Sequence, residues 1–404
     1  MIMKAQIAQK KIKGYKQTEI GVIPEDWEVH EIEDIADVLS GKRIPKGRTL
    51  TENITPYPYI TVSDMGAGSV NLENIRFVPE DVYPLIKKYR IFVDDIYISV
   101  AGTLGLIGTI PKQLNGANLT ENADRLANIK CDKNYLLYIL SSPLIQKRID
   151  EVKTLGAQPK LALTRIRKFC VAIPKTKSEQ TAIATVLSDT DALIEHLEKL
   201  IAKKKAIKQG AMQQLLTAKK RLPGFNGEWE VKKLGEICEI KKGQLITDRS
   251  RIEGNIPVIA GGKVPAYFHN KANRNGKTIT ISASGASAGY VAYHNYPIFA
   301  SDCSSIEESK KYTIEFIYFL LQSKQEKIYK MQTGGAQPHI HPSNLTPINV
   351  SMPKKEEQTA IATILSDMDA EIISLEKKQD KSIMLKQGMM QQLLTGRIRI
   401  YDNN

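Results

Sequence analysis

The chain has 404 residues, 42% of them hydrophobic and 25% charged, with 57 Lys and Arg against 44 Asp and Glu and a formal net charge of +13. This is the composition of a soluble globular protein of two or three domains, and it contains no apolar run long enough to span a membrane. The opening residues lack the pattern of a secretory signal, so we expect a cytoplasmic protein. The basic excess suits a surface that binds phosphates.

Residues 1–175 predict an N-terminal segment and a first α+β domain. Trp27 opens an alternating stretch that ends at Gly41. The runs TPYPYITVSD and RIFVDDIYISVAG are rich in β-branched and aromatic residues, which predicts short strands in a curved sheet. Residues 135–142 predict a helix. Glycines at 102, 105 and 108 have the wrong spacing for a dinucleotide site and indicate a turn between two strands.

Residues 176–218 predict one long helix. Apolar residues such as Ile183, Leu187, Leu193, Leu197 and Ile207 keep a three-four spacing. The segment from 179 to 217 would form a rod of about 58 Å. We expect a solvated face from five lysines, namely Lys199, Lys203, Lys204, Lys205 and Lys208.

Residues 219–353 repeat the first domain with loop deletions. Trp229 and Gly243 follow Trp27 and Gly41 at an offset of 202, and the phrase GAQP recurs at 156 and 335 at an offset of 179. The run KTITISASG predicts a strand, and residues 316–323 predict a helix. Offsets that shrink between fixed landmarks indicate deletions in loops.

Residues 354–404 predict a second long helix and a C-terminal tail. The segment EQTAIATILSDMDAEIISLEK repeats EQTAIATVLSDTDALIEHLEK, and KQGMMQQLLT repeats KQGAMQQLLT, all at an offset of 178. A lone rod would leave its apolar stripe in water, whereas two rods in one chain can pair and bury it. The predicted fold class is α+β: two mixed domains separated by two long helices, paired as an antiparallel coiled coil with pseudo-twofold symmetry. Polar seam residues such as Lys204, Glu371 and Lys378 can fix the register.

These phrases, in this order and twice, resemble the specificity subunit of type I restriction-modification enzymes. GVIPEDWEV and LPGFNGEWEV are similar to the openings of its two target recognition domains, and GGAQPHIHPSNLTPINVSMP is similar to the exit from the second. The resemblance implies a non-catalytic subunit that recognises a bipartite, asymmetric DNA target through two unlike domains. It also implies partners: double-stranded DNA, two methyltransferase subunits and restriction subunits. S-adenosylmethionine, ATP and Mg would then belong to the partners, with no cofactor on this chain.

The sequence agrees with that division of labour. It contains neither the (N/D)PP(Y/F) tetrapeptide of a DNA adenine methyltransferase nor a GxxxxGK(S/T) phosphate loop. The four cysteines lie far apart, and the pair His339 and His341 has no carboxylate or thiol at ligand spacing, so we expect no metal site. Tyr267, Phe268, Tyr290 and Tyr293 could stack on a base, although core packing is the default.

Basic clusters inside the divergent domains are the candidates for DNA contact, because phosphates and base edges are bound by Lys and Arg. In the first domain they are Lys42, Arg43, Lys46, Arg48, Lys87, Lys88 and Arg90. In the second they are Lys241, Lys242, Arg249, Arg251, Lys263, Lys271, Arg274 and Lys277. The candidates for partner binding are the repeated glutamines Gln213, Gln214, Gln391 and Gln392.

Two other classes of protein compete with this interpretation. A free-standing bipartite DNA-binding regulator would bind tightly without partners, but it gives no reason to keep QQLLT identical in both helices. An enzyme with a cofactor cleft would need an acid-base or nucleophile constellation, and neither unit repeats one.

Overall fold

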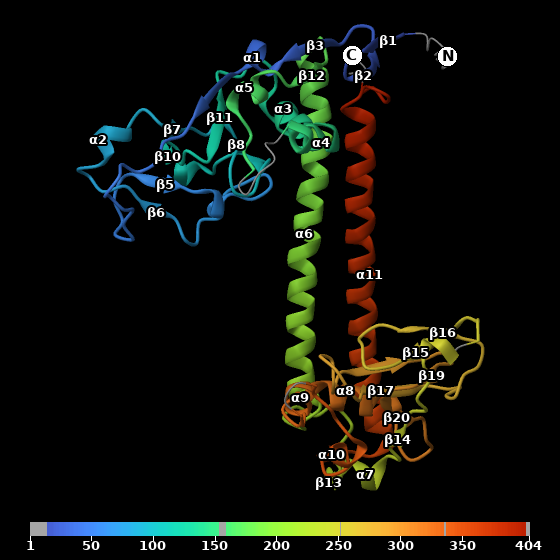
Figure 1. The fold of residues 1–404 in the computed structure, drawn as a ribbon. Coiled ribbons are helices and arrows are strands. Elements are labelled where there is room, and N and C mark those ends of the chain that lie inside the picture. Colours follow the sequence, from blue (N-terminus) through green and yellow to red (C-terminus); the bar gives the residue numbers. More distant parts are fainter. Residues whose placement is uncertain (1–13, 153–158, 251, 335–336, 401–404) are drawn as a thin grey trace. The chain divides into compact units, whose positions relative to one another are not determined.

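The computed structural model describes residues 14–152, 159–250, 252–334 and 337–400 (Figure 1). The chain divides into two compact units: residues 1–195 with 380–404, and residues 196–379. The division falls inside both long helices, α6 (Lys177–Leu215) and α11 (Lys355–Leu393). Each helix has 39 residues and begins and ends two residues before the copied segment that predicted it.

The first unit contains a hairpin, two four-stranded sheets and a two-stranded ladder. The hairpin is β1 (Tyr15–Thr18) with β2 (Gly21–Pro24). One sheet has the order β4 (Asp37–Ser40), β11 (Ala123–Ala127), β8 (Ile96–Ser99), β9 (Ile107–Gly108). The other has the order β6 (Arg76–Phe77), β5 (Pro58–Ile60), β10 (Ala117–Leu119), β7 (Arg90–Ile91). The ladder joins β3 (Glu28–Glu31) to β12 (Cys170–Ile173). The short helices are α1 (Ile32–Ile35), α2 (Tyr83–Ile86), α3 (Lys133–Leu140), α4 (Pro143–Val152) and α5 (Leu163–Arg167).

The second unit repeats this topology with fewer strands. Its larger sheet has the order β14 (Lys241–Lys242), β20 (Cys303–Glu307), β17 (Thr278–Ser282), β18 (Val291–His294). Its smaller sheet has the order β16 (Tyr267–His269), β15 (Ile256–Ile259), β19 (Phe299–Ala300). The ladder joins β13 (Glu230–Lys233) to β21 (Asn349–Met352). The short helices are α7 (Leu234–Ile237), α8 (Ile314–Ser323), α9 (Gln325–Tyr329) and α10 (Pro342–Leu345).

The strands and helices read from the sequence are confirmed where the runs were strongest. The run at 90–102 gives β7 and β8, the run at 277–285 gives β17, and the two aromatic-aliphatic segments give α3 and α8. Gly102 and Gly105, both with positive φ angles, lie in the turn from β8 to β9, and Gly108 belongs to β9.

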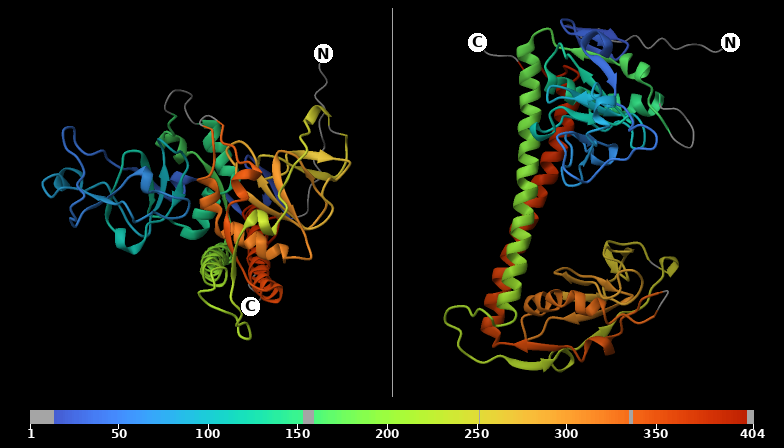
Figure 2. Two further views of the ribbon diagram at one scale, coloured as in Figure 1. Left: turned by 90° about the horizontal axis from the view of Figure 1, so that it is seen from below. Right: turned by 90° about the vertical axis from the view of Figure 1, so that its left-hand side faces the viewer.

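Within each unit, parts of α6 and α11 lie side by side and run in opposite directions (Figures 1 and 2). In the first unit Asp191 binds Lys386 at 2.6 Å. In the second unit Lys204 binds Glu371 at 2.6 Å and Lys208 binds Asp369 at 2.6 Å. Two residues predicted as polar seam positions are therefore ion-pair partners.

Three of the five lysines expected on a solvated face instead bind carboxylates of α11. Lys205 pairs with Glu376 in addition to the two pairs above, and the Lys208 side chain is only 12% exposed. The prediction was wrong for Lys208, which is largely buried against Asp369, whereas Lys205 is exposed and also pairs with a carboxylate. Three apolar residues with seam spacing are exposed instead, namely Leu193, Ile207 and Leu385.

An equivalent group of glutamate, arginine and tryptophan side chains lies at the first turn of each long helix. In the second unit the buried Glu357 carboxylate accepts hydrogen bonds from Arg221 at 2.7 and 2.8 Å and from the indole of Trp229 at 3.2 Å. In the first unit Glu179 accepts from Arg399, whose guanidinium also lies over the Trp27 ring. Each arginine follows the C-terminus of the other helix.

The next residue of each helix ties it to its own domain. The Gln180 side chain donates to the carbonyl of Pro174 at 2.8 Å and accepts from the backbone N–H of Asp132 at 2.8 Å. Gln358 makes the equivalent bonds, to Pro353 at 2.9 Å and from Thr313 at 3.0 Å. The repeated phrase EQ thus connects helix and domain in both units. No helix in the described part of the chain is long and apolar enough to cross a bilayer.

Candidate nucleic-acid interface

In each unit one glycine leads the chain from the sheet that contains β4 or β14 to the sheet that contains β5 or β15. The N–H of Gly41 donates to Ala123, and the N–H of Lys42 donates to Leu119. Gly243 and Gln244 make the matching bonds to Cys303 and Ala300. A Cβ at either glycine would overlap a backbone carbonyl oxygen, of Thr120 or of Ser301. The close approach explains why both landmarks are glycine.

A hydrogen bond from a buried tyrosine fixes the backbone of the segment after Gly41. The Tyr59 hydroxyl donates to the carbonyl of Lys42 at 2.8 Å. Burial raises the pKa of Tyr59 to about 12, so the hydroxyl remains a donor at neutral pH. In the same segment the Lys42 ammonium lies 5.7 Å from the Tyr89 ring centre, and the Arg43 guanidinium pairs with Glu121. The backbone is fixed while the basic side chains stay at the surface.

The segment after Gly243 has a matching anchor with different surface residues. The Tyr267 hydroxyl donates to the carbonyl of Ile246 at 2.5 Å, and the N–H of Ile252 donates to His269 Nδ1 at 3.1 Å. The first unit places KRIPKGR here and the second places QLITDRS. Equivalent loops on a repeated frame therefore present different chemistry.

The predicted basic residues of the first unit divide into free and paired groups. Within the described residues, Lys46, Lys87 and Lys88 are exposed and carry no ion pair. Arg48 pairs with Asp81, and the Arg90 guanidinium lies 5.3 Å from the Phe92 ring centre.

The second unit also mixes surface and structural residues. Within its described part, Lys242, Arg249 and Lys271 are exposed without an ion pair. Lys241 pairs with Glu307 at 2.9 Å, and Lys277 pairs with Glu315 at 2.7 Å. Arg251 lies outside the described residues.

Arg274 has a structural environment. Its side chain is 12% exposed, donates to the Ser305 hydroxyl at 2.9 Å and to the Asn273 carbonyl at 2.7 Å, and lies 3.5 Å from Glu307. A guanidinium held in this way positions β14 beside β20 more directly than it offers a contact to DNA.

A third segment joins this surface in the second unit, the corner of residues 284–290 between β17 and β18. A Cβ at Gly261 would overlap the carbonyl oxygen of Ser284, so the corner touches the loop between β15 and β16. Ser284 also donates to Asp302, next to the carbonyl that Gly243 approaches. Loop 243–246, loop 260–264 and the corner thus form one continuous edge, which we call the loop edge.

The helix α9 packs against this corner and adds lysines that the sequence predictions missed. The Gln325 side chain donates to the carbonyl of Gly289 at 2.7 Å and accepts from the N–H of Val291 at 3.0 Å. The segment KQEKIYK, which contains Gln325, also contains Lys324, Lys327 and Lys330. The three-residue spacing of these lysines is the feature of the sequence that could have pointed to them.

The predicted aromatic residues have mixed roles. Phe268 is 51% exposed, and the Tyr290 ring carries Lys263 at 5.5 Å from its centre. Tyr293 donates to Glu315 at 2.8 Å. His339 and His341 have stacked rings with centres 6.3 Å apart, and His341 is the N-cap residue of α10. Among the described residues, no group of three or more His, Cys, Asp or Glu side chains could hold a metal ion.

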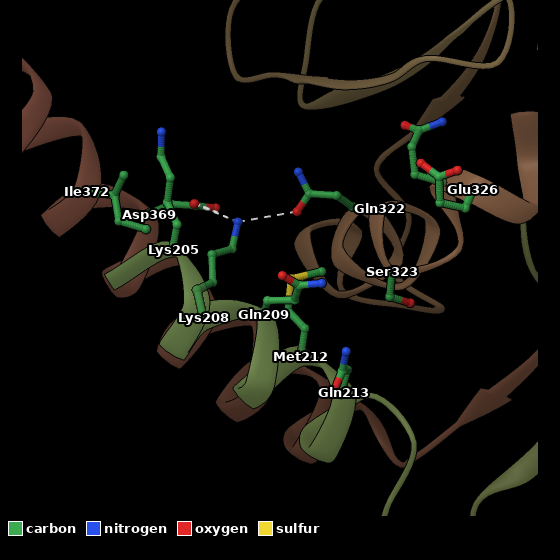
Figure 3. Close-up of a pocket in the computed structure, with 11 residues that line it drawn as sticks. Lys205, Lys208, Gln209, Met212, Gln213, Gln322, Ser323, Glu326, Asp369 and Ile372 are labelled. Atoms are coloured by element: carbon green, nitrogen blue, oxygen red, sulfur yellow. Dashed lines mark hydrogen bonds and ion pairs between the residues drawn. The ribbon is translucent and has the colours of Figure 1, made fainter. Parts of the chain in front are cut away.

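The four predicted partner-binding glutamines lie in the last turns of α6 and α11. Gln213, Gln214 and Gln391 are exposed, and Gln392 is half-buried. Gln213 lines a pocket of the second unit together with Gln209, Gln322 and Glu326 (Figure 3). At this pocket Lys208 donates to Asp369 and to the Gln322 side-chain oxygen at 3.3 Å.

Comparison with known proteins places this architecture. The family model described as the type I restriction modification DNA specificity domain matches residues 24–209 and again 226–385. The chain belongs to this family. Specificity domains are the non-catalytic DNA-recognition components of type I systems, as the sequence predicted.

Individual relatives agree with the family match. A putative type I restriction enzyme specificity subunit of Methanocaldococcus jannaschii, MjaX, is 28% identical over 96% of this chain and 98% of its own length. The MjaIX specificity subunit of the same organism is 23% identical over 96% of both chains. The crystal structure of the S subunit from M. genitalium has a TM-score of 0.64 at 20% identity, covering 91% of this chain and 96% of that one. The specificity-domain fold is therefore shared.

Proposed function

We propose that the chain is the DNA specificity subunit of a type I restriction-modification complex, and that it recognises a bipartite, asymmetric target. The observation that carries this is the repeated frame with unlike loops. The sheet of β4 or β14 has the same strand order in both units, the same glycine crossing follows, and a tyrosine hydroxyl binds the loop after the crossing in each unit, whereas the side chains of that loop differ. Two such readers on one chain suit two different half-sites.

We further propose that α6 and α11 pair along their length as an antiparallel coiled coil that relates the two recognition domains by a pseudo-twofold axis. The ion pairs inside each unit support this arrangement, because their residue numbers rise along one helix and fall along the other. The gap of unread bases between the half-sites would then be set by helix length.

The exposed surfaces of the helices support docking of two identical methyltransferase subunits. Core packing explains why Ile183 and Leu187 recur as Ile361 and Leu365, but it does not explain identity at exposed positions. Identical exposed pairs include Thr181 with Thr359, Thr185 with Thr363, Asp189 with Asp367, Gln209 with Gln387 and Gln213 with Gln391.

The central part of the repeat behaves differently. Between 200 and 207 only Lys203 is kept in the second copy. Each unit therefore combines the conserved start of one helix with the conserved end of the other. A free-standing regulator has no need of two equal surfaces, so this pattern favours the subunit. Restriction subunits would join the same complex, and S-adenosylmethionine, ATP and Mg would be bound by the partners.

Coexpression tests the proposal. The chain with its cognate methyltransferase subunit should methylate adenines at one bipartite sequence, and sequencing of methylated adenines in the host genome would identify it. Methylation by the purified chain alone would contradict the assignment, and so would tight specific binding that partners leave unchanged.

Helix length offers a second test. One added heptad in both α6 and α11 should lengthen the unread gap by about three base pairs, from a rise of 1.5 Å per residue and 3.4 Å per base pair. Both half-sites should remain the same. An unchanged gap would contradict a helix-set spacing.

A further inference from the structure

The two recognition domains differ in net charge. Residues 218–354 contain 19 Lys and Arg against 11 Asp and Glu, whereas residues 14–176 contain 21 against 20. A basic excess in the second of two copies of one frame favours phosphate binding by that copy.

Part of the excess is concentrated beside the loop edge of the second unit. Lys324, Lys327 and Lys330 belong to α9 and its flanking residues, and within the described residues none of them carries an ion pair. Lys327 and Lys330 are exposed and lie three positions apart, so they share one side of the helix. Burial, with a smaller contribution from Lys327, lowers the pKa of Lys324, as expected for crowded cations. Glu326 is the one carboxylate of this helix.

Aromatic rings connect α9 to the loop edge. Gln325 holds the backbone on both sides of Tyr290, and Gln332 donates to the carbonyl of Ala288 at 2.8 Å. The Tyr290 ring supports the Lys263 ammonium, 5.5 Å from its centre. A Cβ placed at Gly289 would lie 3.4 Å from the Tyr329 ring. Lysines around tyrosine rings on a rigid corner form a surface typical of backbone contact with nucleic acid.

The described residues of the first unit form no equivalent surface. Its helix α4 occupies the corresponding place, where Gln146 donates to the carbonyl of Gly105 at 3.1 Å. There Lys147 pairs with Glu151, and Arg148 donates to the carbonyl of Cys170. On α4, Lys147 is therefore paired with a carboxylate and Arg148 is hydrogen-bonded to the backbone of its own domain.

We propose that Lys263, Lys324, Lys327 and Lys330 of the second recognition domain form a phosphate-binding surface for duplex DNA, one without a counterpart among the described residues of the first domain. This surface rests on the proposed function, because it presumes that the loop edge faces DNA. It assigns a larger share of the sequence-independent affinity to the second domain, while the first domain contributes mainly through its loop after Gly41.

Salt dependence of DNA binding tests this surface. The probe is a fluorescent duplex of arbitrary sequence, and its equilibrium binding to the full chain is measured from 50 to 200 mM salt. Each phosphate contact contributes about 0.9 to the slope of log K against log salt, so the variant K327Q/K330Q should lower the slope by about 1.8. The affinity deficit of the variant should therefore shrink about 12-fold over this salt range.

The matched control is K310Q/K311Q, which removes the same charge from exposed positions of the same unit. These lysines lie at the turn before α8, where Lys355 donates to the Lys310 carbonyl, next to the start of α11. This variant should keep the wild-type slope. K147Q in α4 should do so as well, because that lysine is already paired.

The outcomes separate the two levels of the proposal. Wild-type binding with a slope that K327Q/K330Q leaves unchanged overturns this surface and leaves the proposed function standing. Equal loss in K327Q/K330Q and K310Q/K311Q also overturns it, because net charge would then suffice. A wild-type chain that binds no duplex at 50 mM salt contradicts both.

Discussion

Removal of the arginine that binds Glu357 should destabilise the second unit strongly. The Glu357 side chain is 3% exposed and receives two hydrogen bonds from Arg221 and one from Trp229. In Arg221→Met the carboxylate stays buried with one neutral donor. Loss of one partner from a buried ion pair costs about 3–5 kcal/mol. For a body of this size, about 3 kcal/mol corresponds to roughly 6–12 °C in Tm.

The double variant R221M/E357M isolates the pair. Replacement of both charges by apolar groups of similar volume is often close to neutral, so the double variant should recover to within about 1 kcal/mol of wild type. Calorimetry gives the stability, and hydrogen exchange read by peptide assigns the loss to residues 196–379. If both single costs simply add in the double variant, Arg221 and Glu357 are not coupled and this account of the helix start is wrong.

The equivalent change in the first unit should cost more. Arg399→Met removes the guanidinium that donates to the 8% exposed Glu179 carboxylate, and the buried Trp27 indole has no hydrogen-bond partner among the described residues. Hydrogen exchange should then report the loss in residues 14–195. A smaller effect than that of Arg221→Met would contradict the assigned role of the indole.

Three further outcomes follow from the contacts. Gly41→Ala and Gly243→Ala should each cost more than about 1 kcal/mol in denaturant unfolding, because the new Cβ overlaps a carbonyl oxygen, and normal stability would show that the crossing is not tight. Gly210→Ala is the matched control: it lies within α6 with nothing inside 4 Å, and it should stabilise the chain by about 0.5–1 kcal/mol. Burial lowers the pKa of His294 to about 4, so on acidification the unfolded chain protonates this imidazole before the folded chain does. The free energy of unfolding should therefore fall by roughly 3 kcal/mol as the pH drops from about 6.5 to 4. His294→Gln should flatten this pH dependence, and an equal pH slope in the variant would refute the role of His294.

The first turns of the long helices show how far the repeat could be understood in advance. The recurrence of EQ and of the tryptophan was visible at once, but its reason is a contact between residues more than 120 positions apart. Glu357 meets Arg221 and Trp229 only because the end of one helix lies beside the start of the other. Linear spacing carries no information about such a meeting.

The basic candidates show a difference between residues that the sequence could not distinguish. Lys46 and Arg274 look alike in a basic cluster, yet one is exposed and the other is 12% exposed and bound to Ser305 and Asn273. The lysines of α9 were passed over because their neighbours in sequence are ordinary. Their place beside the corner follows from the tertiary contacts of Gln325, which holds the backbone around Tyr290.

The sequence by itself determined the duplication, the two long helices, the mixed domains and the family, because periodicity and repeated phrases are properties of the linear chain. Tertiary structure decided which lysines meet carboxylates, which glycines carry the chain between sheets, and which loops form one edge. Those outcomes depend on distances across strands and between helices, and such distances are set by packing of the whole unit.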